Sequence, residues 1–372
     1  MMADPTTRER LSAIDALRGI AALMVVFFHL QGAFARAPQP WMSDLLAHAF
    51  SKGHYGVNVF FVLSGFVIAY SLRDARPTWS YFARFVFRRS VRLDIPLWCT
   101  IIAETGLVLL SLHFFASQTK ASLPTLPQLL ANATYTQEFL GYPHITPVLW
   151  TLCFEIQFYF VLVATLVLKQ RLAARTTQRF ARIATAVLFA AGFFVSLLAR
   201  NHVFEVGPGW ALIRWNEFAL GVLTYWGVRG STARVAWPLA CLAILTAGVY
   251  RRDLGEALVS VTTAMVCAAC IVAPTLNRLL DKPVLQWLGR VSYSMYLIHG
   301  SVGYRTVSLG QYIWGPSLGP ISGPLLWLFS LTIALTASAV LYWLVERPSL
   351  LLSRRVQLYP DQGGQEPREA SC

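Results

Sequence analysis

The sequence predicts an all-α, polytopic membrane protein with about ten transmembrane helices and both termini on the cytoplasmic side. Three observations support this fold class. Of the 372 residues, 56% are hydrophobic and only 13% are charged, whereas a soluble protein carries about 25% charged residues. Apolar runs of about 20 residues, the length needed to cross a bilayer, recur along the chain. Basic residues gather in alternate connections between these runs, as the positive-inside rule requires.

Ten apolar segments are predicted to cross the membrane. Pro, Gly or a charged residue interrupts several of them, so each end is placed only to within a few residues. An even number of crossings puts both termini on the same side. The predicted spans are 14–34, 55–72, 93–115, 147–168, 183–199, 208–228, 235–250, 254–274, 287–304 and 323–345.

The distribution of Lys and Arg sets the predicted orientation. With the N-terminus inside, 23 of the 31 basic residues fall in cytoplasmic segments and seven in outside loops. Topology therefore accounts for the net charge of +13, and we expect no nucleic-acid partner. We predict one membrane domain over residues 1–348. A cytoplasmic tail over residues 349–372 is predicted to be disordered, because its polar end lacks apolar periodicity.

The six cysteines lie mostly within apolar runs. Cys267 and Cys270 form a CxxC pair, but they stand inside a predicted span without histidine or acidic neighbours. Packing in the core explains them better than metal binding does. We therefore expect neither a metal site nor a disulfide framework.

The first predicted span carries two residues that a bilayer disfavours, Arg18 and His29. Eleven positions separate them, about 20° more than three helical turns, so both lie on one stripe about 16 Å apart. Ionisable groups inside hydrocarbon cost about 3 kcal/mol or more and usually mark function. The alternative is a snorkelling arginine and a histidine that hydrogen-bonds to a neighbouring helix. The shared stripe favours a functional pair.

The basic segment RFVFRRSVRLDIP leads into the third span and contains Arg88, Arg89 and Arg92. Spacings of three and four residues put these side chains on a shared helical face. Guanidinium groups bind phosphates through paired hydrogen bonds and stay charged at any working pH. A specific phosphate ligand and anionic lipid headgroups both fit this pattern. Asp94 is expected to offset part of the charge or to orient one arginine.

Glu155 lies about 12 Å inside the fourth span, eight residues from its outer end. A carboxylate at that depth must be protonated or bonded, so a catalytic role and a structural ion pair with another helix both remain open. In the sixth span, Arg214 and Glu217 stand three residues apart. We expect these two to pair with each other in a structural role.

The ninth span, LGRVSYSMYLIHG, contains Tyr293, Tyr296 and His299 deep in the membrane. Tyr296 and His299 share a helical face, and both a hydrogen-bonded core and a catalytic cluster fit this arrangement. The second span contains Gly65, which predicts a close helix approach or a bend. The longest outside loop, 116–146, serves either as a connector or as part of an acceptor site.

Together the motifs resemble the membrane-bound acyltransferase 3 family, the bacterial polysaccharide O-acyltransferases. They occur in order between residues 15 and 348. Two departures from the family pattern are Asp94, where an aromatic residue often precedes the proline, and WTLC in place of the frequent WSLS. The first departure bears on the donor site. The motifs are DALRGIAALMVVFFH, GVNVFFVLSGF, RRSVRLDIP, LWTLCFEIQFY, RWNEFALG, GRVSYSMYLIH and VERP.

The resemblance implies transfer of an acyl group, expected to be acetyl, from cytoplasmic acyl-CoA to a hydroxyl of a cell-surface or exported saccharide or glycolipid. The implied location is the plasma (inner) membrane of a bacterium, among membrane lipids. The phosphates of coenzyme A suit the three arginines of the basic segment. His29 would be the general base or a transient acyl carrier, with Arg18 and Glu155 as further catalytic candidates. The acyl group, the acceptor and the oligomeric state stay open.

A transporter or flippase of a small anionic or saccharide solute is the alternative from another class, with the intramembrane charges lining its path. The sequence shows neither repeat symmetry nor a matching pair of broken helices, which disfavours it. A catalytically inactive sensor on the same scaffold is a third alternative, which the intact Arg18 and His29 disfavour. Binding of coenzyme A would separate the enzyme from the transporter.

Overall fold

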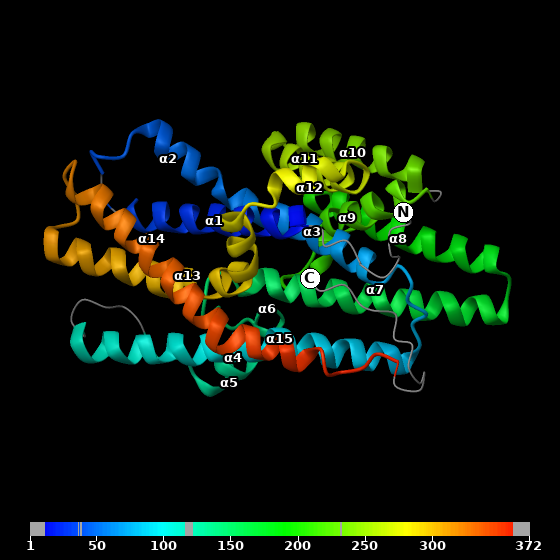
Figure 1. Ribbon diagram of the computed structural model, residues 1–372, viewed down its shortest axis with the longest axis horizontal. Helices are drawn as coiled ribbons and strands as arrows, with labels where there is room; N and C mark the ends of the chain where they lie inside the picture. The colour runs from blue at the N-terminus through cyan, green and yellow to red at the C-terminus, as the bar shows by residue number, and fades with distance from the viewer. Residues whose placement is uncertain (1–11, 36, 38, 116–121, 231–232, 360–372) are drawn as a thin grey trace, which may run out of the picture.

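The computed structural model describes residues 12–35, 37, 39–115, 122–230 and 233–359, and every regular element among them is helical. The predicted all-α fold class is confirmed. Many of the longer helices run roughly along the long axis of the molecule (Figure 1). The elements are α1 (Ser12–Phe34), α2 (Asp44–Ser51), η1 (Lys52–Tyr55), α3 (Gly56–Ser71), α4 (Trp79–Phe115), α5 (Leu126–Ala133), α6 (Gln137–Leu140), α7 (Leu149–Arg175), α8 (Gln178–Arg200), η2 (Ala211–Arg214), α9 (Trp215–Val228), α10 (Ala233–Tyr250), α11 (Leu254–Val272), α12 (Pro274–Leu280), α13 (Pro283–Trp314), α14 (Ser322–Leu341), the π-helical turn η3 (Tyr342–Glu346) and α15 (Arg347–Ser353).

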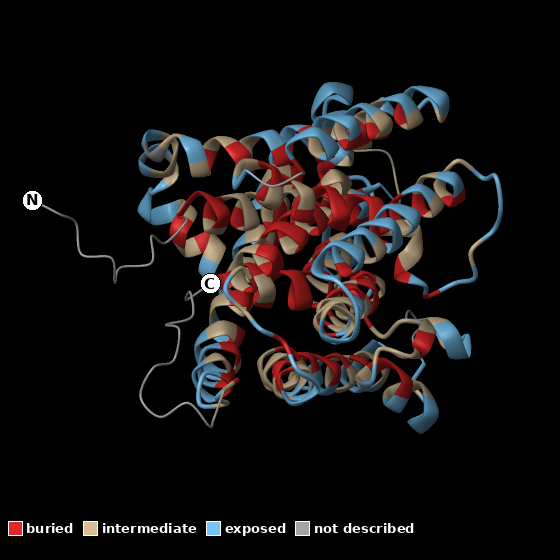
Figure 2. Cartoon of the chain, turned by 90° about the vertical axis from the view of Figure 1, so that its right-hand side faces the viewer, coloured by how far each residue is buried: buried red, intermediate tan, exposed pale blue. Residues whose placement is uncertain are grey.

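Each of the ten predicted spans corresponds to a helix, and eight helical segments of the described chain are long and apolar enough to cross a membrane. The other two helices are α9, which has only 14 residues, and α13, which is rich in polar side chains. Both are enclosed by neighbours: α9 packs against α3, α8, α10 and α11, and α13 against α1 and α14. Figure 2 shows buried residues gathered in the middle of the bundle. A helix shielded from lipid in this way can carry polar groups.

Glycines allow two helix pairs to approach closely. In α1 and α13, Gly19 and Gly289 each face the backbone of the partner helix, and Gly65 and Gly221 do the same between α3 and α9. A methyl group at any of these four positions would overlap with that backbone. Small residues at the contact are what permit tight helix packing within membranes. The predicted close approach at Gly65 is confirmed.

α4 is longer than the predicted third span. It begins at Trp79, so the basic segment belongs to the same helix as the apolar residues after it. Its 37 residues extend over about 56 Å, well beyond the hydrocarbon thickness of about 30 Å. The first turns of α4 therefore project from the membrane domain and present their arginines at the predicted cytoplasmic end.

The predicted domain boundary at residue 348 falls inside α15, so the first part of the expected tail is folded. α14 continues through η3 into α15, which packs against α4. The hydroxyl of Ser349 donates a hydrogen bond to the carbonyl oxygen of Arg92 at 3.0 Å, and Leu358 is buried. Apolar side chains of this segment therefore pack against the part of the bundle that projects with α4. The rest of the expected tail lies outside the described residues.

The described part of the predicted outside loop 116–146 does not stay at the end of the bundle. Its helices α5 and α6 return along the middle of α4 (Figure 1). There the hydroxyl of Tyr135 donates a hydrogen bond to Asp94 at 2.8 Å. Burial, together with the nearby Tyr293 and Asp94, raises the pKa of Tyr135 well above its ordinary value, so the phenol stays protonated. The loop thus enters the bundle at the level where α13 meets α4.

Candidate active site

α13 organises the candidate site, because four of its polar side chains contact four different neighbouring elements. Three of these contacts are hydrogen bonds within 2.8 Å, and the fourth includes a backbone donor at 3.1 Å. In chain order, the contacts join Tyr293 to the backbone of Leu93 in α4, Ser294 to Glu346 in η3, Tyr296 to Thr151 in α7 and His299 to His29 in α1.

His29 and His299 form a hydrogen-bonded pair with a defined proton arrangement. Nδ1 of His29 lies 2.8 Å from Nε2 of His299, and Nδ1 of His299 lies 2.8 Å from the carbonyl oxygen of Met295. A carbonyl oxygen only accepts, so Nδ1 of His299 carries the proton, and Nε2 of the neutral ring accepts. His29 therefore donates through Nδ1. Its own Nε2 keeps a lone pair.

The two histidines differ in exposure. His299 is 2% exposed, whereas His29 is only partly buried and has Tyr304 beside it, with ring centroids 5.9 Å apart. The structural alternative from the sequence, a histidine hydrogen-bonded to a neighbouring helix, is thus present. That hydrogen bond nevertheless leaves one ring nitrogen of the more accessible histidine able to take a proton.

Glu346 interacts with arginines from two helices. Its carboxylate is buried and accepts hydrogen bonds from the backbone N–H and the hydroxyl of Ser294. Arg18 of α1 and Arg92 of α4 both interact with it electrostatically. Glu346 stands in a π-helical turn, a feature often found at functional sites. The sequence marked this residue only through the VERP motif and assigned it no role.

Hydrogen bonds connect Glu155 of α7 to α3 and to a tyrosine of its own helix. The hydroxyl of Ser64 in α3 donates to its Oε1 at 2.7 Å, and Tyr159, one turn along α7, also donates to it. The guanidinium of Arg89 in α4 lies over the ring of Tyr159, 4.7 Å from the centroid. Through Tyr159, the structure connects Glu155 to Arg89 of α4. Asp94, expected to offset charge or to orient an arginine, accepts hydrogen bonds from Ser90 and Tyr135.

The arginines and the histidine pair occupy different levels of the bundle. α13 contacts α4 next to Arg92 through Tyr293, and it contacts α1 through His299. Six residues of helix separate Tyr293 and His299, which corresponds to about 9 Å along the axis. Within α1, Arg18 lies about 16 Å from His29 along the same axis. A ligand held by the arginines must therefore be extended to reach the histidines.

A second buried polar cluster, here named the ion cluster, lies around α9. Glu217 accepts from Arg200 at 2.6 Å and from Asn58 at 2.7 Å, and Arg214 lies 3.3 Å from it, as predicted. Glu256 contacts the same two arginines, Arg200 and Arg214, and Arg251 as well. The sequence placed Arg200 and Arg251 in outside loops.

Comparisons with known proteins agree with the resemblance found in the sequence. A family model described as an acyltransferase domain matches residues 11–343, which include every quoted motif except VERP. MdmB, an acyltransferase of Streptomyces mycarofaciens, is 26% identical over 96% of this chain and 97% of its own length. BcsY of Komagataeibacter xylinus, named as a membrane-bound transacylase, is 26% identical over 98% of this chain and 89% of its own.

YrhL of Bacillus subtilis (strain 168), named as a peptidoglycan O-acetyltransferase, is 24% identical over 91% of this chain. The match spans 54% of YrhL, about half of that protein. No solved structure matches the chain. The extent of the family match is sufficient for assignment: the chain belongs to the acyltransferase 3 family and is a polytopic membrane-bound acyltransferase.

Proposed function

We propose that this acyltransferase moves an acyl group, most simply acetyl, from cytoplasmic acyl-CoA to a hydroxyl of a saccharide or glycolipid at or beyond the outer face. The single observation that carries the proposal is the unprotonated Nε2 of His29, with arginines of two helices on the predicted cytoplasmic side of it. His29 lies about 25 Å along α1 from Ser12 and only five residues before Phe34. It would meet an acceptor that arrives from outside.

The donor is held by its phosphates. Arg88, Arg89 and Arg92 of α4, with Arg18 of α1, offer guanidinium groups at the predicted cytoplasmic level, and such groups bind phosphate oxygens in pairs. The flexible arm of coenzyme A then extends up the bundle toward the histidine pair. The separation of about 9 Å along α13 suits an extended arm, and it explains why the phosphate site and the base need not touch.

The proposed reaction is general-base catalysis by His29. The acceptor hydroxyl gives its proton to Nε2 of His29 while its oxygen forms a bond to the carbonyl carbon of the thioester. The carbon–sulfur bond then breaks, and the proton passes from His29 to sulfur, which leaves free coenzyme A. His299 accepts from Nδ1 of His29 throughout, so it holds the productive tautomer and helps to stabilise the imidazolium.

The two-step alternative uses the same nitrogen. Nε2 of His29 would form a bond to the carbonyl carbon of the thioester while the carbon–sulfur bond breaks, and coenzyme A would leave as its thiolate. The acceptor hydroxyl would then take the acyl group from Nε2, and its proton would pass to the thiolate. Incubation of the purified protein with labelled acetyl-CoA but without acceptor separates the two routes. Label that stays on wild type and not on His29→Ala would support the carrier.

The acceptor site is proposed to lie between α13 and the loop 116–146. Pro147, directly after that loop, lies against Gly300, the residue after His299. Just before it, His144 pairs with Glu138 at 2.6 Å, and both side chains are partly exposed. Hydroxyl-rich ligands suit such a polar, partly open rim. The name of YrhL supports a glycan as the acceptor class.

The proposed location is the plasma (inner) membrane of a bacterium. The organisms of MdmB, BcsY and YrhL are bacteria, and the proposed donor is cytoplasmic. The orientation predicted from the basic residues turns the arginines toward that donor.

The test is transfer of labelled acetyl from acetyl-CoA to a saccharide fraction by membranes that contain the protein. Wild type is compared with His29→Ala, after both are shown to insert and accumulate equally. Loss of a general base lowers the rate about 10²- to 10⁴-fold. Equal transfer by the two proteins would remove His29 from the mechanism. A wild type that binds no coenzyme A would overturn the proposed donor.

A further inference from the structure

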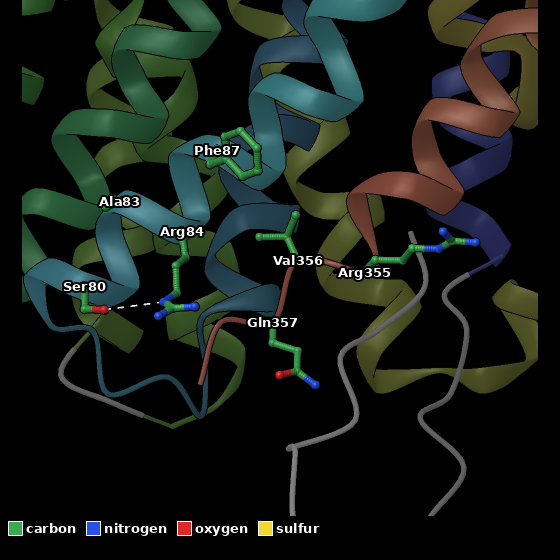
Figure 3. Close-up of a pocket in the computed structure, with 7 residues that line it drawn as sticks. All are labelled: Ser80, Ala83, Arg84, Phe87, Arg355, Val356 and Gln357. Carbon is green, nitrogen blue, oxygen red and sulfur yellow. Dashed lines mark hydrogen bonds between the residues drawn. The ribbon is translucent and has the colours of Figure 1, made fainter. Parts of the chain in front are cut away.

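A cleft of about 600 Å³ opens at the end of the bundle where α4 projects. One wall is a face of α4, and the other is the segment that follows α15. Figure 3 shows the guanidinium of Arg84 between Ser80 and Gln357, with Phe87 above it and the guanidinium of Arg355 turned away. The lining residues are Ser80, Ala83, Arg84, Phe87, Arg355, Val356 and Gln357.

The wall opposite α4 is held in place by specific contacts. Leu358, next to the lining residue Gln357, is buried. The hydroxyl of Tyr359 accepts a hydrogen bond from the backbone N–H of Arg76 at 2.9 Å, and its ring packs against Tyr81 with centroids 5.1 Å apart. These contacts tie the segment to residues on both sides of the start of α4. The cleft is therefore a defined feature of the fold, because the wall opposite α4 is fixed by these contacts.

The lining combines two groups that recognise different parts of a nucleotide. Arg84 is partly buried, and its Nε approaches the hydroxyl of Ser80 at 3.4 Å, which holds the side chain at the cleft. A guanidinium there attracts a phosphate. Phe87 is a large aromatic residue that is 60% exposed, and nucleic-acid bases stack on such rings.

The cleft is in line with the arginines of α4. Arg84 precedes Arg88 by one turn and Arg92 by two turns, or about 12 Å. From the level of Arg92, α13 leads about 9 Å further to His299. A ligand of about 20 Å would thus reach from the cleft to the histidine pair. A compact nucleotide joined to a long thin arm has that shape.

We propose that this cleft binds the nucleotide end of the acyl-CoA donor, with a phosphate on Arg84 and the adenine against Phe87. The inference rests on the proposed function, since it places one part of the proposed donor. It assigns the phosphates nearer the arm to Arg88 and Arg92. Residues 355–357, which follow α15, thereby become part of the donor site, which the sequence did not indicate.

The test compares two donors in nanodiscs of neutral phosphatidylcholine: acetyl-CoA, and S-acetylpantetheine, which lacks the nucleotide. Arg84→Gln is expected to raise KM for acetyl-CoA about tenfold with kcat unchanged, as loss of a charge-assisted hydrogen bond predicts. Rates with S-acetylpantetheine should not change. Inhibition by adenosine 3′,5′-bisphosphate should weaken about tenfold, and Arg84→Lys, which keeps the charge but not the fork, should fall between.

Arg354→Gln is the matched control, because Arg354 is exposed in the same segment and does not line the cleft. It removes the same charge and should alter neither KM nor inhibition. Equal effects of Arg84→Gln on both donors, or no effect on either, would overturn the proposal. If Arg84→Gln acts only in discs with anionic lipid, the cleft holds lipid headgroups and the proposal also fails. A wild type inactive with both donors would instead refute the proposed function.

Discussion

The histidine pair and the ion cluster are both buried polar groups inside a membrane domain, yet their chemistry differs. In the ion cluster, the carboxylates of Glu217 and Glu256 are shared among three arginines, so every charge has an opposite charge beside it. In the histidine pair, every hydrogen bond runs one way, from His29 to His299 to a backbone carbonyl. The first residue of this hydrogen-bonded series, His29, keeps one unprotonated nitrogen on its partly exposed ring.

We propose that this difference separates a structural cluster from a reactive one. Intramembrane charge by itself points to both, because any ionisable group in lipid needs a partner. What distinguishes the histidine pair is an unprotonated nitrogen on a partly exposed ring, whereas the unpartnered atoms of the ion cluster, Oε2 of Glu217 and Nε of Arg251, are buried. The ion cluster should therefore control whether the protein folds, and the histidine pair whether it works. Each prediction below changes one side of this comparison.

The largest expected effect is on stability, from Glu217→Ala. Removal of the carboxylate leaves three arginines with Glu256 as the one remaining counter-ion of the cluster, which costs about 3–5 kcal/mol of the free energy of unfolding. Thermal melting in detergent would measure the loss, beside His29→Ala, which should melt as wild type does. Glu217→Gln, which keeps an acceptor for Asn58, should lose less. A Glu217→Ala variant that is stable but inactive would mean that the ion cluster is part of the active site.

The second effect is on catalysis, from His299→Leu. The apolar side chain cannot accept from Nδ1 of His29, so the productive tautomer is no longer held. We expect kcat to fall about 100-fold, or about 2.7 kcal/mol, with KM for acyl-CoA unchanged. His299→Gln offers an amide oxygen as acceptor and should recover part of the rate. If His299→Gln is as inactive as His299→Leu, His299 acts through packing and not through the hydrogen bond.

The third effect is on donor binding, from Arg92→Gln. This arginine is proposed to bind phosphate, and loss of the contact should raise KM for acyl-CoA about tenfold, or about 1.4 kcal/mol, with a smaller change in kcat. Arg171→Gln removes a charge from an exposed position near the end of α7 and serves as the control. Equal changes in the two variants would mean that only the general positive field matters.

The fold followed from the sequence to a large extent, because membrane helices are encoded locally by apolar runs and flanking arginines. The stripe of Arg18 and His29 and the pair of Arg214 and Glu217 needed only helical geometry, and the structure has both. The helix α15 was missed, because it is short and depends on a surface of α4 that sequence does not display.

The partners within the site could not be found in the same way. His29 and His299 are 270 residues apart, and no local spacing relates them. Glu155 was a catalytic candidate or one half of an ion pair, and its hydrogen bonds are with Ser64 and Tyr159. Arg200 was counted as an outside residue, although it ends in the ion cluster. In each case the missing information was which helix packs against which.

The smallest effect is expected from a third polar pair, Arg305 and Glu104, which join α13 to α4 through two hydrogen bonds of 3.0 and 2.7 Å. The arginine side chain is 30% exposed, so this pair is less buried than the ion pair of Arg200 and Glu217. Arg305→Gln should cost less than about 1 kcal/mol of the free energy of unfolding and leave transfer unchanged. Paired melting and transfer assays would check both. If Arg305→Gln lowered the free energy of unfolding as much as Glu217→Ala does, the ion pair itself, and not its burial, would determine the cost. The comparison between the ion cluster and the histidine pair would then lose its basis.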